Sequence, residues 1–169
     1  MRFDVIVIGG GKSGFAEAME AVRAGRSCAL ISEGRSLDRI DYDSFTKAGG
    51  TLLMGDSAES VVFDGSRVAY IHTRKLGDTP LEAGLFVLAT GRFFGKGLVA
   101  DMNTVREALM GLDLDFDPDR EKWFDSDFFA PQPFMSRGVV ADAESRPLKD
   151  GKRIENVRVV GSILSKTVR

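Results

Sequence analysis

The sequence predicts an α/β fold with a parallel sheet and a small antiparallel β-meander, on three observations. Residues 5–8, Val-Ile-Val-Ile, are an apolar β-branched run without polar alternation, which is typical of a strand buried on both faces of a parallel sheet. A glycine-rich turn and a stripe of apolar residues at helical spacing follow directly. A second apolar run, residues 28–31, comes next, so the first 33 residues form a complete βαβ unit of the Rossmann type.

The helix of this unit is predicted from Phe15, Ala18, Met19 and Val22, which recur at spacings of three, one and three residues. This spacing places the four side chains on one helix face, where they can cover the sheet. Gly25 follows the last of them and is expected to end the helix, because glycine readily adopts the left-handed conformation found just beyond helix ends.

The middle of the chain predicts the meander. Residues 36–48 are polar with a few apolar residues at helical spacing, and a Gly-Gly pair separates them from a strand at 51–54. Residues 60–63 and 67–73 are strand-like and are joined through Asp-Gly-Ser, a sequence that favours a tight turn. We expect residues 51–73 to be antiparallel strands.

The second half of the chain returns to the parallel sheet and then changes in composition. Residues 85–89 are a fully apolar strand, a helix is expected at 103–110, and residues 156–160 read as a last strand. Between Phe93 and Phe134 lie eight of the 15 aromatic residues (12 Phe, 2 Tyr and 1 Trp). We therefore expect one domain, 1–169, in which the aromatic-rich segment 92–150 covers one end of the core.

Composition excludes several classes of protein. The chain has 23 basic and 25 acidic residues, so it lacks the positive charge expected of a nucleic-acid binder or a polybasic membrane anchor. A lone cysteine, Cys28, excludes an intramolecular disulfide and a cysteine-cluster metal site. The N-terminus does not resemble a signal peptide, and 18 apolar residues never run together. These features favour a soluble cytoplasmic protein with a small ligand.

The strongest motif is a glycine fingerprint between the first strand and the first helix. Its three glycines permit a tight turn, close backbone approach to a pyrophosphate and close helix–strand packing, and the free N–H groups of the helix N-terminus favour phosphates. Glu33, 19 positions after the last glycine, is placed to accept hydrogen bonds from an adenosine ribose, and it would repel a 2′-phosphate. The cofactor-binding residues predicted here are Gly9, Gly11, Lys12, Ser13, Gly14 and Glu33.

Other chemistry-bearing residues have simpler interpretations. His72, the only histidine, lies in a predicted meander strand, so no histidine-based acid–base pair can be assembled. Arg92, Lys96 and Arg137 could gather a phosphate, although solvated surface positions are the simpler interpretation of scattered cations. No spacing of residues indicates a metal site, and no catalytic residue is identified.

The order of elements resembles the FAD domain of glutathione-reductase-like flavoproteins. In those proteins an Ala-Thr-Gly turn after an apolar strand passes near the adenine and pyrophosphate, and a late strand ends in Gly-Asp, whose Asp binds a ribityl hydroxyl. Here Thr90-Gly91 and Gly161-Ser162 stand at the matching positions, which adds these four residues to the predicted cofactor site. The uncharged Ser162 implies a weaker grip on the flavin.

A narrower resemblance is to the B subunit of the anaerobic glycerol-3-phosphate dehydrogenase. The similarity covers most of the chain, including the serine of the closing motif, and is carried by residues 88–95, 97–101, 111–112, 123–134, 146–148 and 161–164. It implies FAD as the cofactor, with FMN as an alternative, in a membrane-associated complex that oxidises glycerol 3-phosphate and passes electrons toward quinone. Any membrane contact, at the inner membrane, would then be through partner subunits.

Length separates this chain from that family. The family's usual chain is more than twice as long, and only 17 residues, 34–50, separate the second strand from the meander, where a large insertion is expected. We therefore expect a substrate-facing part and the helix after the final strand to be missing. Both a naturally short chain and a truncated one are consistent with this length.

Three functions follow from these observations. The first is an FAD-dependent redox subunit that relays electrons from a partner subunit and is inactive alone. The second is a non-catalytic assembly subunit with a degenerate flavin site. The third is an NAD-binding protein, since the fingerprint glycines and Glu33 suit NAD equally, although the predicted meander argues against it.

Overall fold

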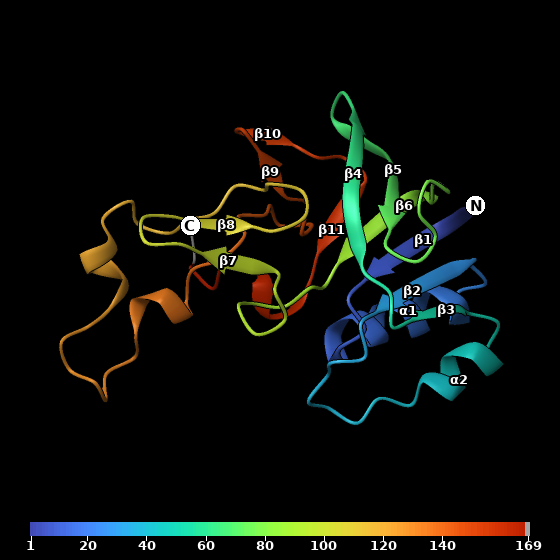
Figure 1. Cartoon of the computed structure of the whole chain (residues 1–169), viewed down its shortest axis with the longest axis horizontal. Helices are drawn as coiled ribbons and strands as arrows, with labels where there is room; N and C mark the ends of the chain where they lie inside the picture. The colour runs from blue at the N-terminus through green and yellow to red at the C-terminus, as the bar shows by residue number, and fades with distance from the viewer. Residues whose placement is uncertain (168–169) are drawn as a thin grey trace.

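A five-stranded parallel sheet forms the centre of the computed structural model, which describes residues 1–167 (Figure 1). The strand order is β11-β6-β1-β2-β3, and every neighbouring pair is parallel. The strands are β1 (Arg2–Ile8), β2 (Cys28–Ser32), β3 (Thr51–Met54), β6 (Glu82–Leu88) and β11 (Val157–Val159). The α/β fold with a Rossmann-type parallel sheet is thus confirmed.

Both faces of the sheet are covered, as the unbroken apolar strands predict. On one face, Val5 and Val7 of β1 pack with Ala18 and Met19 of α1 (Lys12–Arg23), and a short second helix, α2 (Tyr42–Lys47), joins this layer. Strand side chains alternate between faces. Ile6 and Ile8 therefore contribute to the opposite core, with residues from the second half of the chain.

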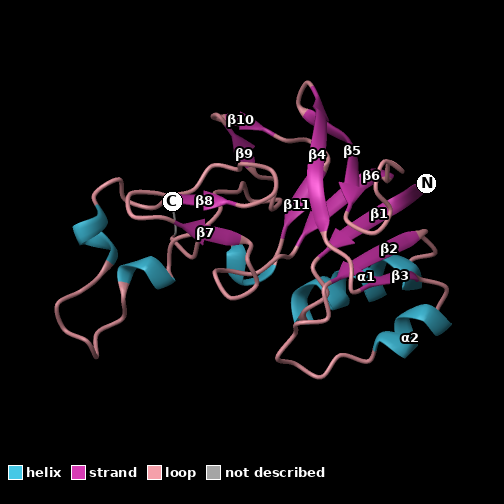
Figure 2. Ribbon diagram, in the orientation of Figure 1, coloured by secondary structure: helices cyan, strands magenta, loops and turns pink. Residues whose placement is uncertain are grey.

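The opposite face is covered in part by an antiparallel hairpin, and two further small antiparallel sheets lie beyond β11 (Figure 2). The hairpin of β4 (Ala58–Asp64) and β5 (Arg67–Thr73) is confirmed, with the turn at Gly65 in the left-handed conformation. Ile71 and Leu81 form an additional antiparallel bridge to this hairpin. Two further short pairs are β7 (Leu98–Ala100) with β8 (Val105–Glu107), and β9 (Leu148–Lys149) with β10 (Lys152–Arg153).

One expectation about the middle of the chain is wrong. We predicted antiparallel strands throughout 51–73, but β3 pairs in parallel with β2 and extends the central sheet. The physical reason is the connection before it, since α2 ends at a glycine pair that returns the chain along the edge of β2. Leu52 packs against the core on the α1 side, and Leu53 packs against the opposite core, as in a sheet covered on both faces. The helix expected at 36–48 is limited to α2.

The helix predicted at 103–110 is also absent, and strand β8 stands there instead. Side-chain acceptors satisfy the backbone groups that a helix would have paired. Asp101 accepts the N–H groups of Asn103 and Thr104 and turns the chain back toward β7. The buried Glu107 carboxylate accepts the N–H groups of Leu109 and Met110 at 2.9 and 2.6 Å and so forms a tight turn after β8. Such local hydrogen bonds compete with helix formation.

The segment of residues 113–138 forms a lobe beyond β7 and β8, drawn in yellow to orange in Figure 1. At its base, Phe116 makes edge-to-face contacts with Phe93 and Trp123 at centroid distances of 6.3 and 6.0 Å. The side chains at its outer end are not buried, since Phe128 and Phe129 are 86% and 93% exposed. None of the helices within residues 1–167 is long and apolar enough to span a membrane.

The Glu107 turn yields a stability prediction. We expect Glu107→Ala to lower the free energy of unfolding by about 2 to 3 kcal/mol, because buried N–H groups would lose their charged acceptor. Urea denaturation followed by circular dichroism measures this change. Glu59→Ala, at an exposed position, is the matched control and should change the value by less than about 0.5 kcal/mol. Equal effects of the two substitutions would contradict the assigned role.

Candidate functional site

A cavity of about 520 Å³ lies where the central strands end. Its wall is built from the segments that follow the carboxyl ends of β1, β2, β6 and β11, which is where ligands bind in open parallel sheets. The volume is within the range of small-molecule sites. Nine of the ten predicted cofactor-binding residues line it, namely Gly9, Gly11, Lys12, Ser13, Glu33, Thr90, Gly91, Gly161 and Ser162.

The glycine turn leaves no room for side chains on its sheet side. Gly9 has φ +112°, and a Cβ there would lie 2.1 Å from the carbonyl oxygen of Ala89. Gly14, the tenth predicted residue, does not line the cavity, but a Cβ on it would lie 1.8 Å from the carbonyl oxygen of Gly9. At Gly11 an added Cβ would meet nothing within 4 Å, so this part of the turn faces open space.

Helix α1 begins directly at this open space. Its N-cap is Gly11, no side chain caps its N-terminus, and its first turn contains no acidic residue. The unpaired N–H groups and the positive end of the helix dipole favour an anion there. The side chains of Lys12 and Ser13 line the same wall. This combination is suited to a phosphate or pyrophosphate.

Glu33 lies after β2 on the cavity wall with its side chain 40% exposed. Its Oε2 atom is 3.8 Å from Nε of Arg35, whose side chain is 61% exposed. An ion pair this open contributes little to stability and does not block the carboxylate. Glu33 can therefore accept hydrogen bonds from a ribose placed beside the glycine turn.

The end of β6 carries an unusual polar group. Thr90 Oγ1 is buried and has no hydrogen-bond partner within the part of the chain that the structure describes. A buried hydroxyl without a partner is costly, and such groups occur where a ligand completes the site. Gly91, at φ +72°, and Gly97 let the following loop fold closely over Thr90, since a Cβ on Gly97 would lie 2.6 Å from Thr90 Oγ1.

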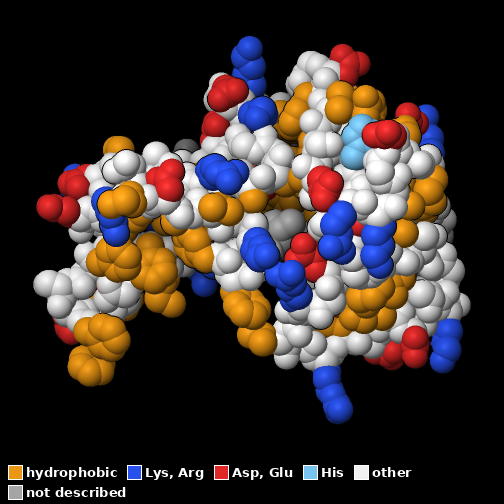
Figure 3. All heavy atoms as spheres, in the orientation of Figure 1, with side chains coloured by type: hydrophobic (Ala, Val, Ile, Leu, Met, Phe, Trp, Pro, Cys, Tyr) orange, Lys and Arg blue, Asp and Glu red, His pale blue; other side chains and the backbone are white. Residues whose placement is uncertain are grey.

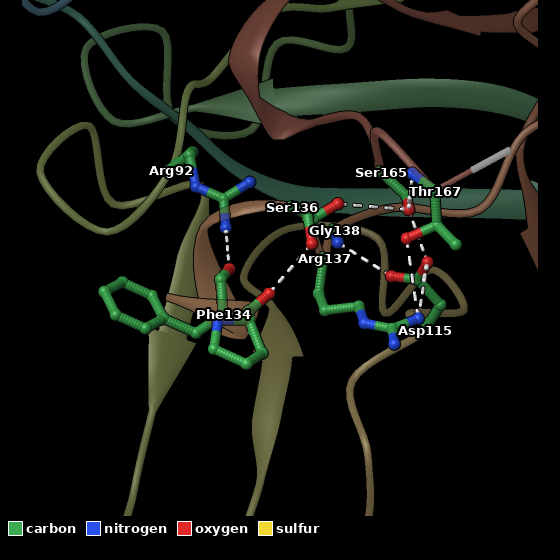
Figure 4. A network of polar contacts seen from close by, with 9 residues as sticks. Arg92, Asp115, Phe134, Ser136, Arg137, Gly138, Ser165 and Thr167 are labelled. Carbon is green, nitrogen blue, oxygen red and sulfur yellow. Dashed lines mark hydrogen bonds and ion pairs between the residues drawn. The ribbon is translucent and has the colours of Figure 1, made fainter. Parts of the chain in front are cut away.

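Arg92 lines the cavity and also connects separate segments of the chain by hydrogen bonds. The interpretation of Arg92 as a solvated surface cation is therefore wrong. The Arg92 guanidinium donates to the carbonyl oxygen of Phe134 at 2.6 Å (Figure 4) and to that of Ser162 at 3.0 Å. Burial lowers the pKa of Arg92 from its ordinary value, and the Asp115 carboxylate opposes that shift. Lys96 also lines the cavity, whereas Arg137 lies outside its wall.

Asp115 organises the neighbouring part of this network (Figure 4). Its side chain is 7% exposed, accepts hydrogen bonds from the Gly138 N–H and the Ser165 hydroxyl, and lies 3.8 Å from the Arg137 guanidinium. Lys166 N–H also donates to the carbonyl oxygen of Ser136 at 2.8 Å. These hydrogen bonds fix the C-terminal segment to the base of the lobe. Together with the hydrogen bond from Arg92, they position Ser162.

The remaining candidates lie away from the cavity. His72 Nδ1 is 3.2 Å from the Ser60 hydroxyl in the β4–β5 hairpin, and neither residue lines the cavity wall. Cys28 is buried in the core, and burial raises the pKa of its thiol to about 12. Within residues 1–167 no three His, Cys, Asp or Glu side chains gather as a metal site.

Three parts of the wall were not predicted from the sequence, namely residues 35–38 after β2, residues 56–59 after β3 and residues 107–109 at the end of β8. The second of these belongs to the site because β3 is parallel to β2, so its carboxyl end opens onto the same edge of the sheet. Asp56 is buried there and accepts hydrogen bonds from the Thr73 hydroxyl and the N–H groups of Ser57 and Lys75. An Asp-Ser pair after an apolar run was the available signal.

The residues present fit the adenosine diphosphate part of a flavin dinucleotide. An uncapped helix N-terminus and a side-chain-free turn suit the pyrophosphate, and an accessible carboxylate at the end of the second strand suits the ribose. The unpartnered Thr90 hydroxyl supplies an additional polar group on the wall.

Comparison with protein families gives a match to the FAD binding domain over residues 40–168. This match begins after the glycine fingerprint and Glu33, which suit FAD and NAD equally, so it is independent of that motif. FAD is therefore the cofactor of this fold, as the sequence predicted.

Two curated relatives of this chain have the same name. The chain is 39% identical over 134 residues to the B subunit of anaerobic glycerol-3-phosphate dehydrogenase from Vibrio cholerae, covering 78% of this chain and 31% of the relative. It is 35% identical over 163 residues to the subunit of that name from Yersinia pseudotuberculosis, covering 93% and 38%. The chain thus spans about a third of the length of these relatives. The resemblance seen in the sequence is confirmed.

Among solved structures, the crystal structure of the GidA-related protein from Thermus thermophilus matches with a TM-score of 0.52. The match covers 98% of this chain and 91% of that one at 15% identity, which supports the fold alone.

Thr90 yields a second prediction. We expect Thr90→Val to make the ligand-free protein more stable, by about 1 kcal/mol, because an unpartnered buried hydroxyl is replaced by a methyl group, and to weaken FAD binding. Chemical denaturation and FAD titration measure the two effects. The matched control is Thr73→Val, which should destabilise the protein because the Thr73 hydroxyl donates to Asp56 at 2.7 Å. Loss of stability in both variants would show that Thr90 is satisfied in the free protein.

Proposed function

The chain belongs to the FAD binding domain family, and we propose that it is the flavin-bearing redox subunit of a dehydrogenase resembling the anaerobic glycerol-3-phosphate dehydrogenase. The observation that carries the proposal is that the fingerprint glycines, Glu33, the Thr-Gly turn and the closing Gly-Ser pair line the same cavity. Four strand ends contribute these residues, although they are up to about 150 positions apart in the sequence.

The residues of the cavity wall have separate roles in this proposal. The glycine turn and the N-terminus of α1, with Lys12 and Ser13, hold the pyrophosphate, and Glu33 accepts hydrogen bonds from the adenosine ribose. Thr90 and Gly91 form the wall beside them, and Gly161 and Ser162 approach the flavin half. Bound FAD supplies the capacity to accept and release electrons, and the protein supplies position and electrostatics.

Ser162 gives the flavin half an unusual environment for this proposal. It can form a hydrogen bond but adds no negative charge, while the Arg92 guanidinium is fixed 3.0 Å from its carbonyl oxygen. A cation held beside the ligand favours negative charge in the cavity. This arrangement is suited to a flavin that stores electrons between a donor and an acceptor.

The lobe supports assembly with other subunits. Phe128 and Phe129 are highly exposed and in edge-to-face contact, with ring centroids 5.6 Å apart, and Figure 3 shows apolar side chains gathered on this lobe. Gln132 holds the loop in shape by donating to the carbonyl oxygens of Asp127 and Ala130. Rigid exposed aromatic residues are typical of protein interfaces. We propose that companion dehydrogenase subunits cover them, and that any contact with the inner membrane is through these subunits.

The same exposed lobe favours a second function, a non-catalytic assembly subunit whose flavin site is degenerate. The two functions differ in whether the cavity binds flavin with useful affinity. An NAD-binding protein would use the same turn and Glu33. The FAD family match over residues 40–168 disfavours it, because that match lies outside the fingerprint shared by both cofactors.

The ribose contact gives a direct test of the cofactor site. Protein reconstituted with FAD should show flavin absorption, and Glu33→Ala should weaken FAD binding about tenfold, near 1.5 kcal/mol, which is at the low end for a charged hydrogen bond because the carboxylate is 40% exposed. FMN has no adenosine ribose, so its binding should change little. Titration monitored by flavin fluorescence measures both ligands. Failure of FAD and FMN to bind the folded protein at high micromolar concentration would favour the assembly function.

We also expect the isolated chain not to oxidise glycerol 3-phosphate. Such a reaction needs a cationic phosphate pocket, a base for the hydroxyl proton and a wall that holds the carbon near the flavin. His72, the only histidine, is hydrogen-bonded to Ser60 on the β4–β5 hairpin. It does not line the cavity, so it is not placed to act as this base. Steady-state assays with an artificial electron acceptor, using FAD-loaded protein with and without companion subunits, measure turnover. Robust turnover by the lone chain would contradict the proposed division of labour.

A further inference from the structure

We propose that Tyr42 is a positioning residue for the flavin nucleotide: its hydroxyl fixes the glycine turn relative to the Glu33 loop, and so sets the spacing between the phosphate and ribose contacts. The residue does not line the cavity and belongs to no motif identified in the sequence. The inference rests on the proposed flavin site and adds a residue behind it.

A directed chain of hydrogen bonds connects the two contacts. Tyr42 Oη donates to the carbonyl oxygen of Gly10 at 2.5 Å and lies 3.2 Å from Ser32 Oγ, and the N–H of Gly34 donates to Ser32 Oγ at 3.1 Å. A phenol has one proton, and here that proton goes to Gly10. Ser32 must therefore donate to Tyr42, so the chain runs from Gly34 through Ser32 and Tyr42 to Gly10.

The two ends of this chain of hydrogen bonds lie where a dinucleotide would be held. Gly34 directly follows Glu33, the proposed ribose acceptor, and Gly10 is the middle of the glycine turn. The turn also lies directly against β2, because a Cβ on Gly10 would be 2.3 Å from the side chain of Ser32. Steric contact prevents closer approach, and the hydrogen-bond chain prevents separation.

Tyr42 is itself held by its surroundings. It is the first residue of α2, whose N-cap Asp41 accepts the N–H of Ser44 at 3.2 Å. Its ring contacts Phe15 of α1 edge-to-face, with ring centroids 6.0 Å apart and an interplanar angle of 86°. A ring fixed between two helices can orient its hydroxyl with little further loss of conformational entropy.

The anchored carbonyl also orients the amide that follows it. In a trans peptide the C=O of Gly10 and the N–H of Gly11 point in opposite directions. Because Tyr42 does not line the cavity and Gly11 does, the tie turns the carbonyl away from the cavity and the amide toward it. Removing a carbonyl from the site also removes a negative dipole end that would repel a phosphate.

The test is Tyr42→Phe, which keeps the ring and its contact with Phe15 and removes only the hydroxyl. We expect FAD and ADP to bind about tenfold more weakly by calorimetric titration, whereas adenosine, which has no phosphate, changes less than about twofold. The thermal midpoint of the ligand-free protein should fall by no more than about 4 °C. Tyr70→Phe, which alters the chain's other tyrosine on β5, is the matched control and should leave all four values unchanged.

Ser32→Ala provides a second variant, because it breaks the same hydrogen-bond chain one step earlier, at a residue that itself lines the cavity. Like Tyr42→Phe, it should weaken the binding of FAD much more than that of adenosine. In the double variant, FAD affinity should fall by less than the product of the two single-variant factors, because both substitutions interrupt one network. If Tyr42→Phe does not fold, Ser32→Ala alone decides the question by the same criterion.

Three results would overturn the inference. Wild-type affinity for FAD in Tyr42→Phe would show that the tie is irrelevant to the nucleotide. Equal weakening of FAD and adenosine would indicate a general structural role. Wild-type protein that binds neither FAD nor ADP would remove the flavin site itself and this inference with it.

Discussion

The cavity depends on the close approach of the glycine turn to the end of β6. Gly9 is packed so tightly against Ala89 that a single methyl group would overlap its carbonyl oxygen, and Gly14 in turn is packed against Gly9. These two contacts bring the N-terminus of α1 to the edge of the sheet, directly above the strand ends. The ends of β2, β6 and β11 are placed relative to this turn, because β2 and β6 pair with β1 and β11 pairs with β6.

The second half of the chain completes the site through polar ties rather than through regular structure. Apart from β11, the described residues after β6 add short strand pairs and short 3-10 helices, yet Arg92 joins the loop after β6 to the Gly-Ser turn and to the lobe. Asp115 attaches the C-terminal segment to the same region. Interrupting this partly buried network is costly where it leaves a buried group unpaired. Ser162 is therefore positioned by contacts from both sides of the cavity.

The parts of the fold that the sequence predicts correctly are those whose sequence patterns lie within a few residues of one another. The βαβ unit, the hairpin at Gly65 and the last strand were predicted because apolar runs and glycine turns act within a few residues. The pairing of β3 could not be read in this way, since four residues of mostly intermediate exposure suit either sheet and the choice depends on the connection through α2. The helix predicted at 103–110 failed because Asp101 and Glu107 satisfy backbone amides that the pattern assigned to a helix. The glycines and Glu33 of the site were predictable, whereas the roles of Arg92, Asp56 and Tyr42 required three-dimensional neighbours.

The distribution of charge on the lobe constrains what can cover it. Residues 113–138, which form the lobe, contain seven acidic and three basic side chains, and the two most exposed aromatic rings, Phe128 and Phe129, directly follow Asp127 in the sequence. An anionic membrane surface would repel such a segment, whereas a protein surface with an apolar pocket and basic rim would attract it. A second copy of the same lobe would place like charges opposite one another. This charge distribution complements a different, basic protein surface, which agrees with the companion subunits proposed above.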